Sequence, residues 1–206
     1  MEWTVFGPVP KGRQEEVRND LLAGKSPAGL EPVQARGGNL YFRTRAGAEG
    51  LFSKTNPGNT AWAKTTFYAP KAGTMYAMVG FDAPARSTRR CSGVPAAGEW
   101  SQCGTRIWVN GKEVKNPQTY KLAGQRRYEK HTWNSPDNEI SFDNEEFWWA
   151  RPPIPFQVKA GENTILIEQP YTGNFQSWGV SFIPVKKSGD RWIADPSYYL
   201  KNKGEK

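Results

Sequence analysis

The sequence predicts an all-β protein, an antiparallel β-sandwich of the jelly-roll type. Short runs rich in β-branched and aromatic residues recur along the chain, each bounded by turn residues. The 206 residues include 21 glycines and 16 prolines, which is typical of a chain with many turns. No helical pattern alternates with the strand-like runs, so a parallel α/β sheet is disfavoured. Aromatic residues make up 13% of the chain, and they predict a core built from few, large side chains.

Residues 1–36 lack the strand-like texture and are expected to form an irregular N-terminal segment or linker. Within it, "RQEEVRNDLLAG" (13–24) has the pattern of one short helix. Val17, Leu21 and Leu22 would share one side of that helix, and Gly24 would end it.

The strand-like runs fill residues 37–195, which we expect to be one sandwich domain. In "TMYAMVGF" the alternation places Met75, Ala77 and Val79 on one face of a strand. "TILIE" (164–168) is apolar on both faces, as a central strand packed from both sides would be. The predicted strands are "NLYFRT", "TAWAKTTFYA", "TMYAMVGF", "TRIWVN", "PFQV", "NTILIEQ" and "SWGVSFIPV".

The connections between these runs are of two kinds. Asn110-Gly111 stands between two β-like runs and predicts a type I′ hairpin, because both central residues of that turn need positive φ. Residues 82–104 and 115–153 are too long for hairpins, and long loops on a rigid sandwich are where binding usually occurs. Residues 196–206 form a polar tail that we expect to fray.

The charge balance favours anionic partners without selecting one. Lys and Arg number 28 against 20 Asp and Glu, which gives a net charge of +8. The basic residues are scattered, so a basic surface without an anionic ligand stays open. Nucleic acid is not expected, because the aromatic residues form no stacking motif. No stretch of eighteen apolar residues predicts a membrane span. The densest basic groups are Arg86, Arg89 and Arg90, and then Arg126, Arg127 and Lys130.

Two cysteines, Cys91 and Cys103, flank a loop rich in glycine and proline. Two cysteines cannot form a zinc site alone, and the single histidine, His131, is distant in sequence. We favour a disulfide that closes this loop, which would stabilise the fold by about 3 kcal/mol and imply an oxidising compartment. Two unrelated reduced thiols are the alternative.

The stretch "DNEEFWWARPPIP" (143–155) concentrates carboxylates, aromatic rings and prolines. A glycosidase needs two carboxylates about 5 Å or about 6.5–9.5 Å apart across the substrate. Asp143, Glu145 and Glu146 are near neighbours on one loop and do not naturally give that separation. We therefore expect no catalytic residue in this chain.

Sugar binding is the stronger hypothesis for this stretch. An exposed indole meets the C–H face of a pyranose, and polar side chains meet its hydroxyl groups. Trp148 and Trp149 would supply the indole, although consecutive residues of an extended chain point to opposite sides, so at least one should be buried. The alternative is that both rings pack in the core or against another domain. The candidate glycan-binding residues are Trp148, Trp149, Asn144, Glu145, Arg151, Trp133, Trp100 and, for an acidic group, Arg86.

No metal ligand can be named from the sequence, and no cofactor is expected. Oxygen atoms of "DNEE" (143–146) or "SPDNE" (135–139) could hold a structural calcium ion. The spacing of an EF-hand is absent from both stretches.

Three segments read together resemble a known family. They are "NPGNTAWAKTTFYAPKAGTMYAMVGFDAPARS", "GEWSQCGTRIWVNGKEV" and "FQVKAGENTILIEQP". In order and spacing they resemble the C-terminal galactose-binding-like β-sandwich of Bacteroidetes glycoside hydrolase family 20 β-N-acetylhexosaminidases. The resemblance covers residues 37–185. The two cysteines, the triplet Phe147-Trp148-Trp149 and the segment 120–138 depart from the pattern of that family.

This resemblance implies a non-catalytic accessory domain of an exported glycan-degrading enzyme, located in the periplasm or at the cell surface. Its expected partners are N-acetylhexosamine-containing or acidic glycans and the parent catalytic domain. The resemblance equally allows a structural brace that packs on the catalytic domain and binds no sugar.

Overall fold

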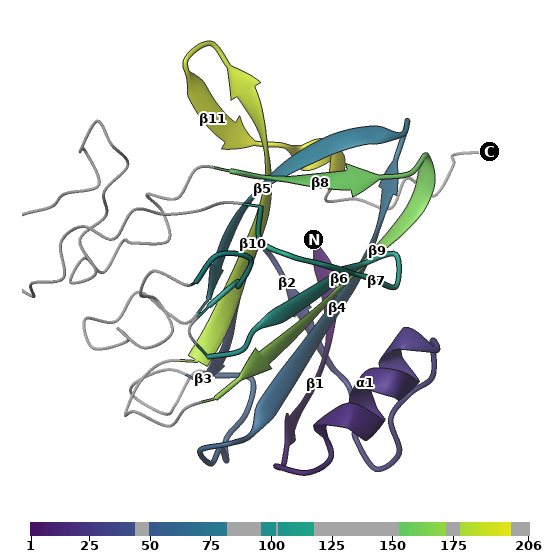
Figure 1. Cartoon of the computed structure of the whole chain (residues 1–206), viewed down its shortest axis with the longest axis vertical. Helices are drawn as coiled ribbons and strands as arrows, with labels where there is room; N and C mark the ends of the chain where they lie inside the picture. The colour runs from purple at the N-terminus through teal and green to yellow at the C-terminus, as the bar shows by residue number, and fades with distance from the viewer. Residues whose placement is uncertain (44–49, 82–95, 102, 118–152, 172–177, 199–206) are drawn as a thin grey trace, which may run out of the picture.

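The computed structural model describes residues 1–43, 50–81, 96–101, 103–117, 153–171 and 178–198. Two antiparallel sheets pack face to face (Figure 1), which confirms the predicted all-β sandwich. Sheet A has the order β2 (Val33–Arg36), β1 (Glu2–Val9), β4 (Thr60–Ala69), β9 (Gly161–Pro170), β6 (Arg106–Val109) and β7 (Lys112–Val114). Sheet B has the order β11 (Arg191–Ala194), β10 (Trp178–Ser188), β5 (Gly73–Phe81) and β8 (Ile154–Val158), with β3 (Asn39–Arg43) paired to β10.

All seven strand-like runs form strands of the sandwich. Strand β9 lies between β4 and β6 and pairs with β4 along its whole length. Its Ile165 and Ile167 enter the main core, whereas Leu166 joins a second cluster on the opposite face. The prediction of a central strand packed on both faces is confirmed.

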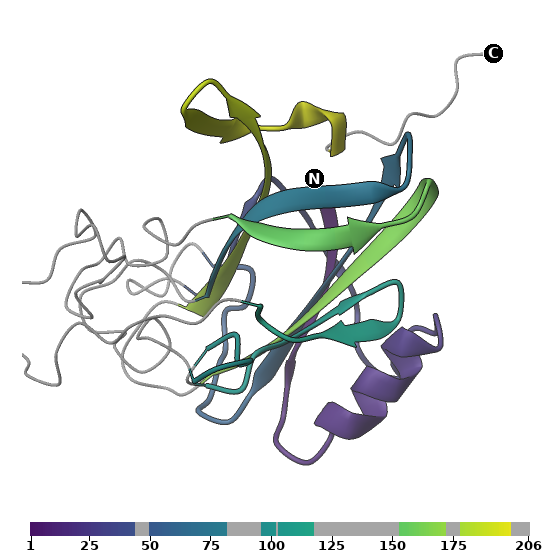
Figure 2. The same ribbon diagram turned by 45° about the horizontal axis from the view of Figure 1, so that its top comes forward.

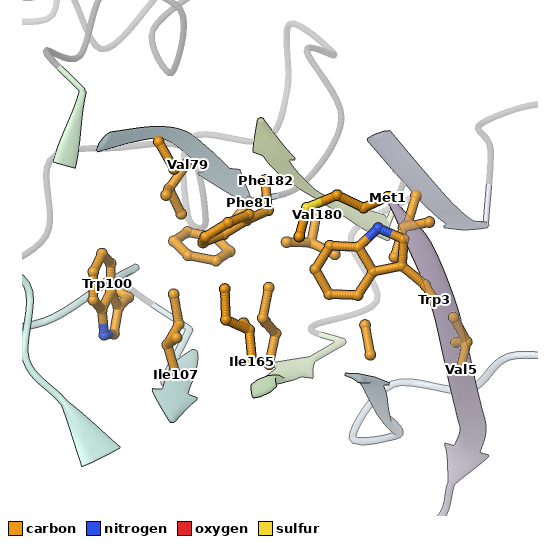
Figure 3. Packing of buried hydrophobic residues seen from close by; sticks show 14 of the residues in the cluster. Met1, Trp3, Val5, Val79, Phe81, Trp100, Ile107, Ile165, Val180 and Phe182 are labelled. Carbon is orange, nitrogen blue, oxygen red and sulfur yellow. The ribbon is translucent and has the colours of Figure 1, made fainter. Parts of the chain in front are cut away.

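The main core fills the space between the sheets and is dominated by aromatic rings. In β5 the predicted alternation is confirmed, because Met75, Ala77 and Val79 are all buried. Figure 3 shows Trp3 beside Phe182, and these rings meet edge to face at 6.2 Å. Each such ring removes roughly 150–250 Å² from water, which compensates for the low count of aliphatic residues.

The N-terminal segment differs from the expectation of an irregular linker. Strand β1 pairs with β4 and β2, and it sends Trp3 and Val5 into the main core. The sequence did not mark this segment as a strand, because β1 is stabilised by its neighbours in the sheet rather than by its own propensity. Residues 1–36 therefore belong to the sandwich domain.

Helix α1 (Gln14–Leu22) confirms the helix predicted within 13–24. It ends in a Schellman motif: Gly24 has φ 76°, its N–H donates to the Leu21 carbonyl, and the Lys25 N–H donates to the Asp20 carbonyl. Figure 2 shows α1 on the side of sheet A that faces away from sheet B. The second hydrophobic cluster lies beneath the helix and consists of Phe6, Val9, Val17, Leu21, Trp62, Trp108 and Leu166.

Two turns at one end of sheet A are tied together by asparagines. Asn110 and Gly111 have φ 52° and 80° and connect β6 to β7, which confirms the predicted hairpin with positive φ at both positions. The buried amide of Asn163 accepts hydrogen bonds from the Lys159 N–H and from the Asn110 side chain, both at 2.9 Å. The two turns thereby hold each other in register.

The C-terminal part adds a hairpin that the sequence reading did not separate from the tail. Strands β10 and β11 pair from Val185↔Ala194 to Ser188↔Arg191. Within the predicted tail 196–206, a short 3-10 helix, η1 (Pro196–Tyr198), places the Tyr198 ring edge to face with Phe67 at 5.7 Å.

Candidate functional site

Most of the predicted glycan-binding residues lie outside the described residues. Trp100 and Cys103 are described. Cys103 is disulfide-bonded, and its predicted partner Cys91 is among the residues outside, so this pairing stays a prediction. The other residues outside are Trp148, Trp149, Asn144, Glu145, Arg151, Trp133 and Arg86.

Trp100 is a core residue and offers no ring face to a sugar. Its side chain is only 2% exposed, and its ring stacks on Phe156 with centroids 5.9 Å apart. Its Nε1–H donates to the Val114 carbonyl at 2.7 Å (Figure 3 shows the ring pointing between the sheets). The prediction of Trp100 as a glycan contact is therefore corrected: a tryptophan in a glycine-rich loop is held there by packing.

Trp100 also brings the ends of the two long connections to one edge of the sandwich. Its ring contacts Phe81 at the end of β5 as well as Phe156 in β8. Gly98 and Asn116 form an isolated antiparallel bridge, and the Asn116 side chain donates to the Glu99 carbonyl at 3.0 Å. The segment before β6 is thus bonded to the segment after β7.

A pocket of about 500 Å³ opens at this edge, and we call it the loop-end pocket. Its wall carries both signs of charge together with two hydroxyl groups. Glu99 and Lys115 are exposed at the pocket, whereas Ser101 and Thr105 are buried in its floor. The lining residues are Gly98, Glu99, Trp100, Ser101, Gly104, Thr105, Arg106, Glu113 and Lys115.

The charges of the loop-end pocket are largely neutralised within it. The Arg106 guanidinium donates to both Glu113 carboxylate oxygens, at 3.1 and 2.5 Å, and Lys115 Nζ lies 3.4 Å from Glu113. The hydrogen bonds from Arg106 lower the pKa of Glu113 below its ordinary value and raise the pKa of Arg106. This part of the wall is therefore rigid and carries little net charge.

The side chains in the floor of the pocket are connected by hydrogen bonds. Ser101 Oγ and Thr105 Oγ1 are 2.6 Å apart, and Thr105 Oγ1 donates to Gln169 Oε1 at 2.6 Å. The Cys103 N–H donates to Ser101 Oγ at 3.1 Å, so the disulfide-bonded residue is fixed to the same floor. Hydroxyls, a carboxylate and a guanidinium in fixed positions can recognise an uncharged polyhydroxylated ligand.

A second charged cluster lies beside this pocket, under α1. Arg18 donates to both carboxylate oxygens of Glu168, at 3.1 and 2.9 Å, and its guanidinium lies about 6 Å from the Trp62 and Trp108 rings. Burial raises the pKa of Glu168, and the hydrogen bonds from Arg18 partly offset that effect. This buried pair fastens the helix to sheet A, and we assign it a structural role.

The outer face of sheet B carries an aromatic pair in which Tyr76 is exposed and Trp192 is half-buried. Tyr76 is 39% exposed, and its ring centroid is 5.1 Å from that of Trp192, over which Lys187 Nζ lies at 5.1 Å. The alternation in "TMYAMVGF" had already placed Tyr76 away from the core. Trp192 could not be found in this way, because the sequence analysis predicted no strand at β11 (Arg191–Ala194).

Among the described residues, no group of three or more His, Cys, Asp or Glu side chains is placed to hold a metal ion. The stretches 135–139 and 143–146, considered for calcium, lie outside these residues. No helix in the described ranges is both long and apolar enough to cross a membrane.

No protein-family model and no curated protein matches this sequence. Among solved structures, the chain is similar to the PA14 domain of the antifreeze protein MpAFP, with a TM-score of 0.37 and 12% identity over 94% of this chain and 85% of that chain. It is also similar to a family 35 carbohydrate-binding module from an environmental isolate. That match has a TM-score of 0.29 and 13% identity, and it covers 70% of this chain and 76% of the module.

Proposed function

We propose that this chain is a non-catalytic glycan-binding module that holds an uncharged part of a glycan in the loop-end pocket. The observation that carries the proposal is the fixed, internally neutralised set of polar side chains around that pocket. Its volume of about 500 Å³ falls in the range of small-molecule sites, roughly 300–1,000 Å³.

The chemistry of the wall suits sugar hydroxyls. A hydroxyl donates to a carboxylate and accepts from a guanidinium or ammonium group, so Glu99, Arg106 and Lys115 can each take part. Because Arg106 and Glu113 already fix one another, little side-chain entropy is lost when a ligand binds. An anionic ligand would have to compete with Glu113 for the same cations.

The predicted aromatic platform would complete this site. The second long connection leaves the described structure after Pro117, two residues beyond Lys115 in the pocket wall. Trp148 or Trp149 on that connection would supply the stacking surface, with Asn144, Glu145 and Arg151 as hydroxyl partners. These assignments remain predictions.

Calorimetric titration with N-acetylglucosamine oligomers tests the proposal. The double variant Glu99→Gln/Lys115→Met removes two exposed charged groups from the pocket. It keeps the two hydrogen bonds between Arg106 and Glu113 and loses only the contact of Lys115 with Glu113. We expect affinity to fall about tenfold, since hydrogen bonds to charged groups contribute about 1.5–3 kcal/mol. The matched control Glu162→Gln/Lys54→Met makes the same chemical change at exposed positions outside the pocket. Equal affinity in both double variants would overturn the assignment of the pocket.

The wider setting is part of the same proposal. The parent protein would be an exported glycoside hydrolase of the β-N-acetylhexosaminidase type, acting in the periplasm or at the cell surface, and its catalytic residues would lie elsewhere. The purified chain should release no sugar from chromogenic N-acetylglucosaminides. Turnover that is lost in Glu145→Gln or Glu146→Gln would contradict a non-catalytic role.

A structural brace is the second candidate function, and the aromatic pair on sheet B favours it. Tyr76 is 39% exposed, and the register of β5, β10 and β11 puts Trp192 on the same side of the sheet. Two adjacent aromatic rings on an open sheet face are the kind of surface that a neighbouring domain can cover. In that case Tyr76→Ser and Trp192→Ser would weaken association with the parent catalytic domain and leave glycan binding unchanged. Loss of glycan binding in these variants would instead move the sugar site to sheet B.

A further inference from the structure

Two pockets of about 380 and 310 Å³ adjoin on the outer face of sheet A, beside the end of α1. Leu21, Gly24 and Lys64 line both of them, so we treat the two as one Lys64 groove. It shares no lining residue with the loop-end pocket, and the Trp108 ring, 4.8 Å from the Arg106 guanidinium, separates the two.

The position of Lys64 is fixed by the sheet. It lies on β4 opposite Thr4 of β1 and opposite Leu166 of β9, at the centre of the six-stranded sheet. The next outward position along β4 is Thr66, which is opposite Thr164. The backbone at Lys64 therefore has paired strands on both sides and cannot move away from a ligand.

Helix α1 covers part of this face and leaves the rest open. Its Val17 and Leu21 pack on the second cluster, and the Schellman motif at Gly24 turns the chain away. Lys64 is consequently half-buried at the boundary, and it lines the same pocket as the apolar Leu21 and the hydroxyl-bearing Thr4 and Thr66.

Lys64 differs from the other half-buried cations of this face. Arg18 is paired with Glu168, and Arg106 with Glu113. Within the described ranges, no carboxylate lies at ion-pairing distance from Lys64. The carboxylate of Glu2, which lines the groove, is itself 3.3 Å from Arg36.

The remaining lining adds positive charge and neutral hydrogen-bonding groups. Lys25 and Lys159 are exposed at the two ends of the groove, one in each pocket. Thr4 and Thr66 line one pocket with Lys64, and Thr164 lines the other. Threonine hydroxyls in the same groove as a cation that has no carboxylate partner among the described residues match a ligand with both hydroxyl groups and a negative charge.

We propose that the Lys64 groove binds an acidic saccharide, with its sulfate or carboxylate group on Lys64 and its hydroxyls on the threonines. This second site rests on the proposed glycan-binding function but is separate from the loop-end pocket. The two sites would take different parts of a glycan. The loop-end pocket, with its paired charges, takes uncharged sugar residues, and the Lys64 groove, whose cation has no carboxylate partner in the described structure, takes acidic ones.

The test uses N-acetylglucosamine-6-sulfate as the probe, with N-acetylglucosamine and inorganic sulfate as separate titrations against the whole chain. Lys64→Met should weaken binding of the sulfated sugar about tenfold, the loss expected for one charge-assisted hydrogen bond. The control Lys54→Met lowers the net charge equally at an exposed loop position and should leave the affinity within about twofold, since long-range charge effects are screened by salt. Glucuronic acid distinguishes a carboxylate site from a sulfate site.

Three results would overturn the inference. Equal weakening in Lys64→Met and Lys54→Met would mean attraction by net charge alone. Inorganic sulfate binding as tightly as the sulfated sugar would mean a simple anion site without saccharide contacts. Unchanged affinity in Lys64→Met would mean that the groove is not the site.

The loop-end pocket and the Lys64 groove can be tested independently of each other. Glu99→Gln/Lys115→Met should leave binding of the sulfated sugar unchanged, and Lys64→Met should leave binding of neutral oligomers unchanged. If the unmodified chain bound no neutral oligomer but lost sulfated-sugar binding in Lys64→Met, the loop-end pocket would be rejected as a glycan site and the groove retained. The reverse pattern would retain the pocket and remove the groove.

Discussion

The outer face of sheet A has two regions in which charged side chains have different partners, and we call them the paired end and the open end. At the paired end, Arg18, Glu168, Arg106 and Glu113 form two bidentate ion pairs under and beside α1. At the open end, Lys64 has hydroxyl neighbours and, within the described chain, no carboxylate partner. The same sheet therefore uses charge for stability at one end and offers it to a ligand at the other.

The difference follows from what covers each end. Beneath the helix, Glu168 is only 5% exposed, and an unpaired charge there would be costly. Beyond Gly24 the face is open, so the ammonium group of Lys64 keeps part of its hydration and needs no internal partner. A charged side chain that is covered by the helix thus needs an ion-pair partner, whereas one on the open part of the face can bind a ligand.

The largest expected effect concerns the support of the paired end. Trp100 bonds to Val114 in β7, next to Glu113, and its ring is buried. Trp100→Ala should lower the free energy of unfolding by about 4 kcal/mol through cavity formation. The matched change Trp192→Ala, on the open face of sheet B, should cost about 1 kcal/mol or less. Urea denaturation measures both, and similar losses would contradict the placement of Trp100 in the core.

Removing one cation from each end tests the comparison itself. Arg18→Met leaves Glu168 buried without its bidentate partner and should cost about 3 kcal/mol. Lys64→Met breaks no ion pair in the described structure and should change stability by less than about 0.5 kcal/mol. Chemical denaturation of both variants at neutral pH measures the two losses of unfolding free energy. If Lys64→Met were as damaging, the open end would also carry structural charge.

A double variant separates the ion pair from the rest of the helix contact. Breaking a buried pair costs more than replacing it with apolar side chains. Arg18→Met/Glu168→Leu should therefore be more stable than Arg18→Met by about 1 kcal/mol or more. Denaturation curves of the two variants give this difference directly. A double variant that is less stable than the single one would mean that Glu168 has another essential partner.

The smallest effect is the pH dependence of stability, because the pKa values of two neighbouring carboxylates are shifted in opposite directions. Arg106 lowers the pKa of Glu113, so the stability from Glu113 is present above its ordinary value near 4.5 and is lost as the pH falls. Burial raises the pKa of Glu168, so its contribution is present below that ordinary value and is lost as the pH rises through the raised value.

Unfolding free energies at about pH 6 and about pH 3 measure this contrast. Glu113→Gln should reduce the loss of stability on acidification, because it removes a group that is stabilising only when charged. Glu168→Gln should increase that loss, because it removes a group favoured by acid. Changes of the same sign in both variants would contradict the assigned directions.

Local pattern was enough to predict the strands, because alternation and turn residues act over a few positions. The outward placement of Tyr76, the buried face of β5 and the Asn110-Gly111 turn all follow from such short-range signals. Strand β1 escaped detection because its stability comes from β4 and β2, which are distant in sequence.

The candidate sites were harder to predict because they depend on strand register. Arg18 and Glu168 are 150 positions apart, and their pairing requires both the helix docking and the place of β9 in the sheet. Trp100 looked like an exposed loop tryptophan until its partner Phe156 was known. That no carboxylate of the described residues pairs with Lys64 is likewise a property of its neighbours and not of the segment "AWAKTTF".

Amide NMR titration of the whole chain with a β-1,4-linked N-acetylglucosamine trimer tests the central claim most directly. We expect saturable shifts that cluster at residues 98–101, 104–106 and 115 around the loop-end pocket. An absence of shifts up to about 10 mM, well above the Kd of even a weak complex of about 4 kcal/mol, would contradict it. So would shifts confined to Tyr76 and Trp192 on the outer face of sheet B.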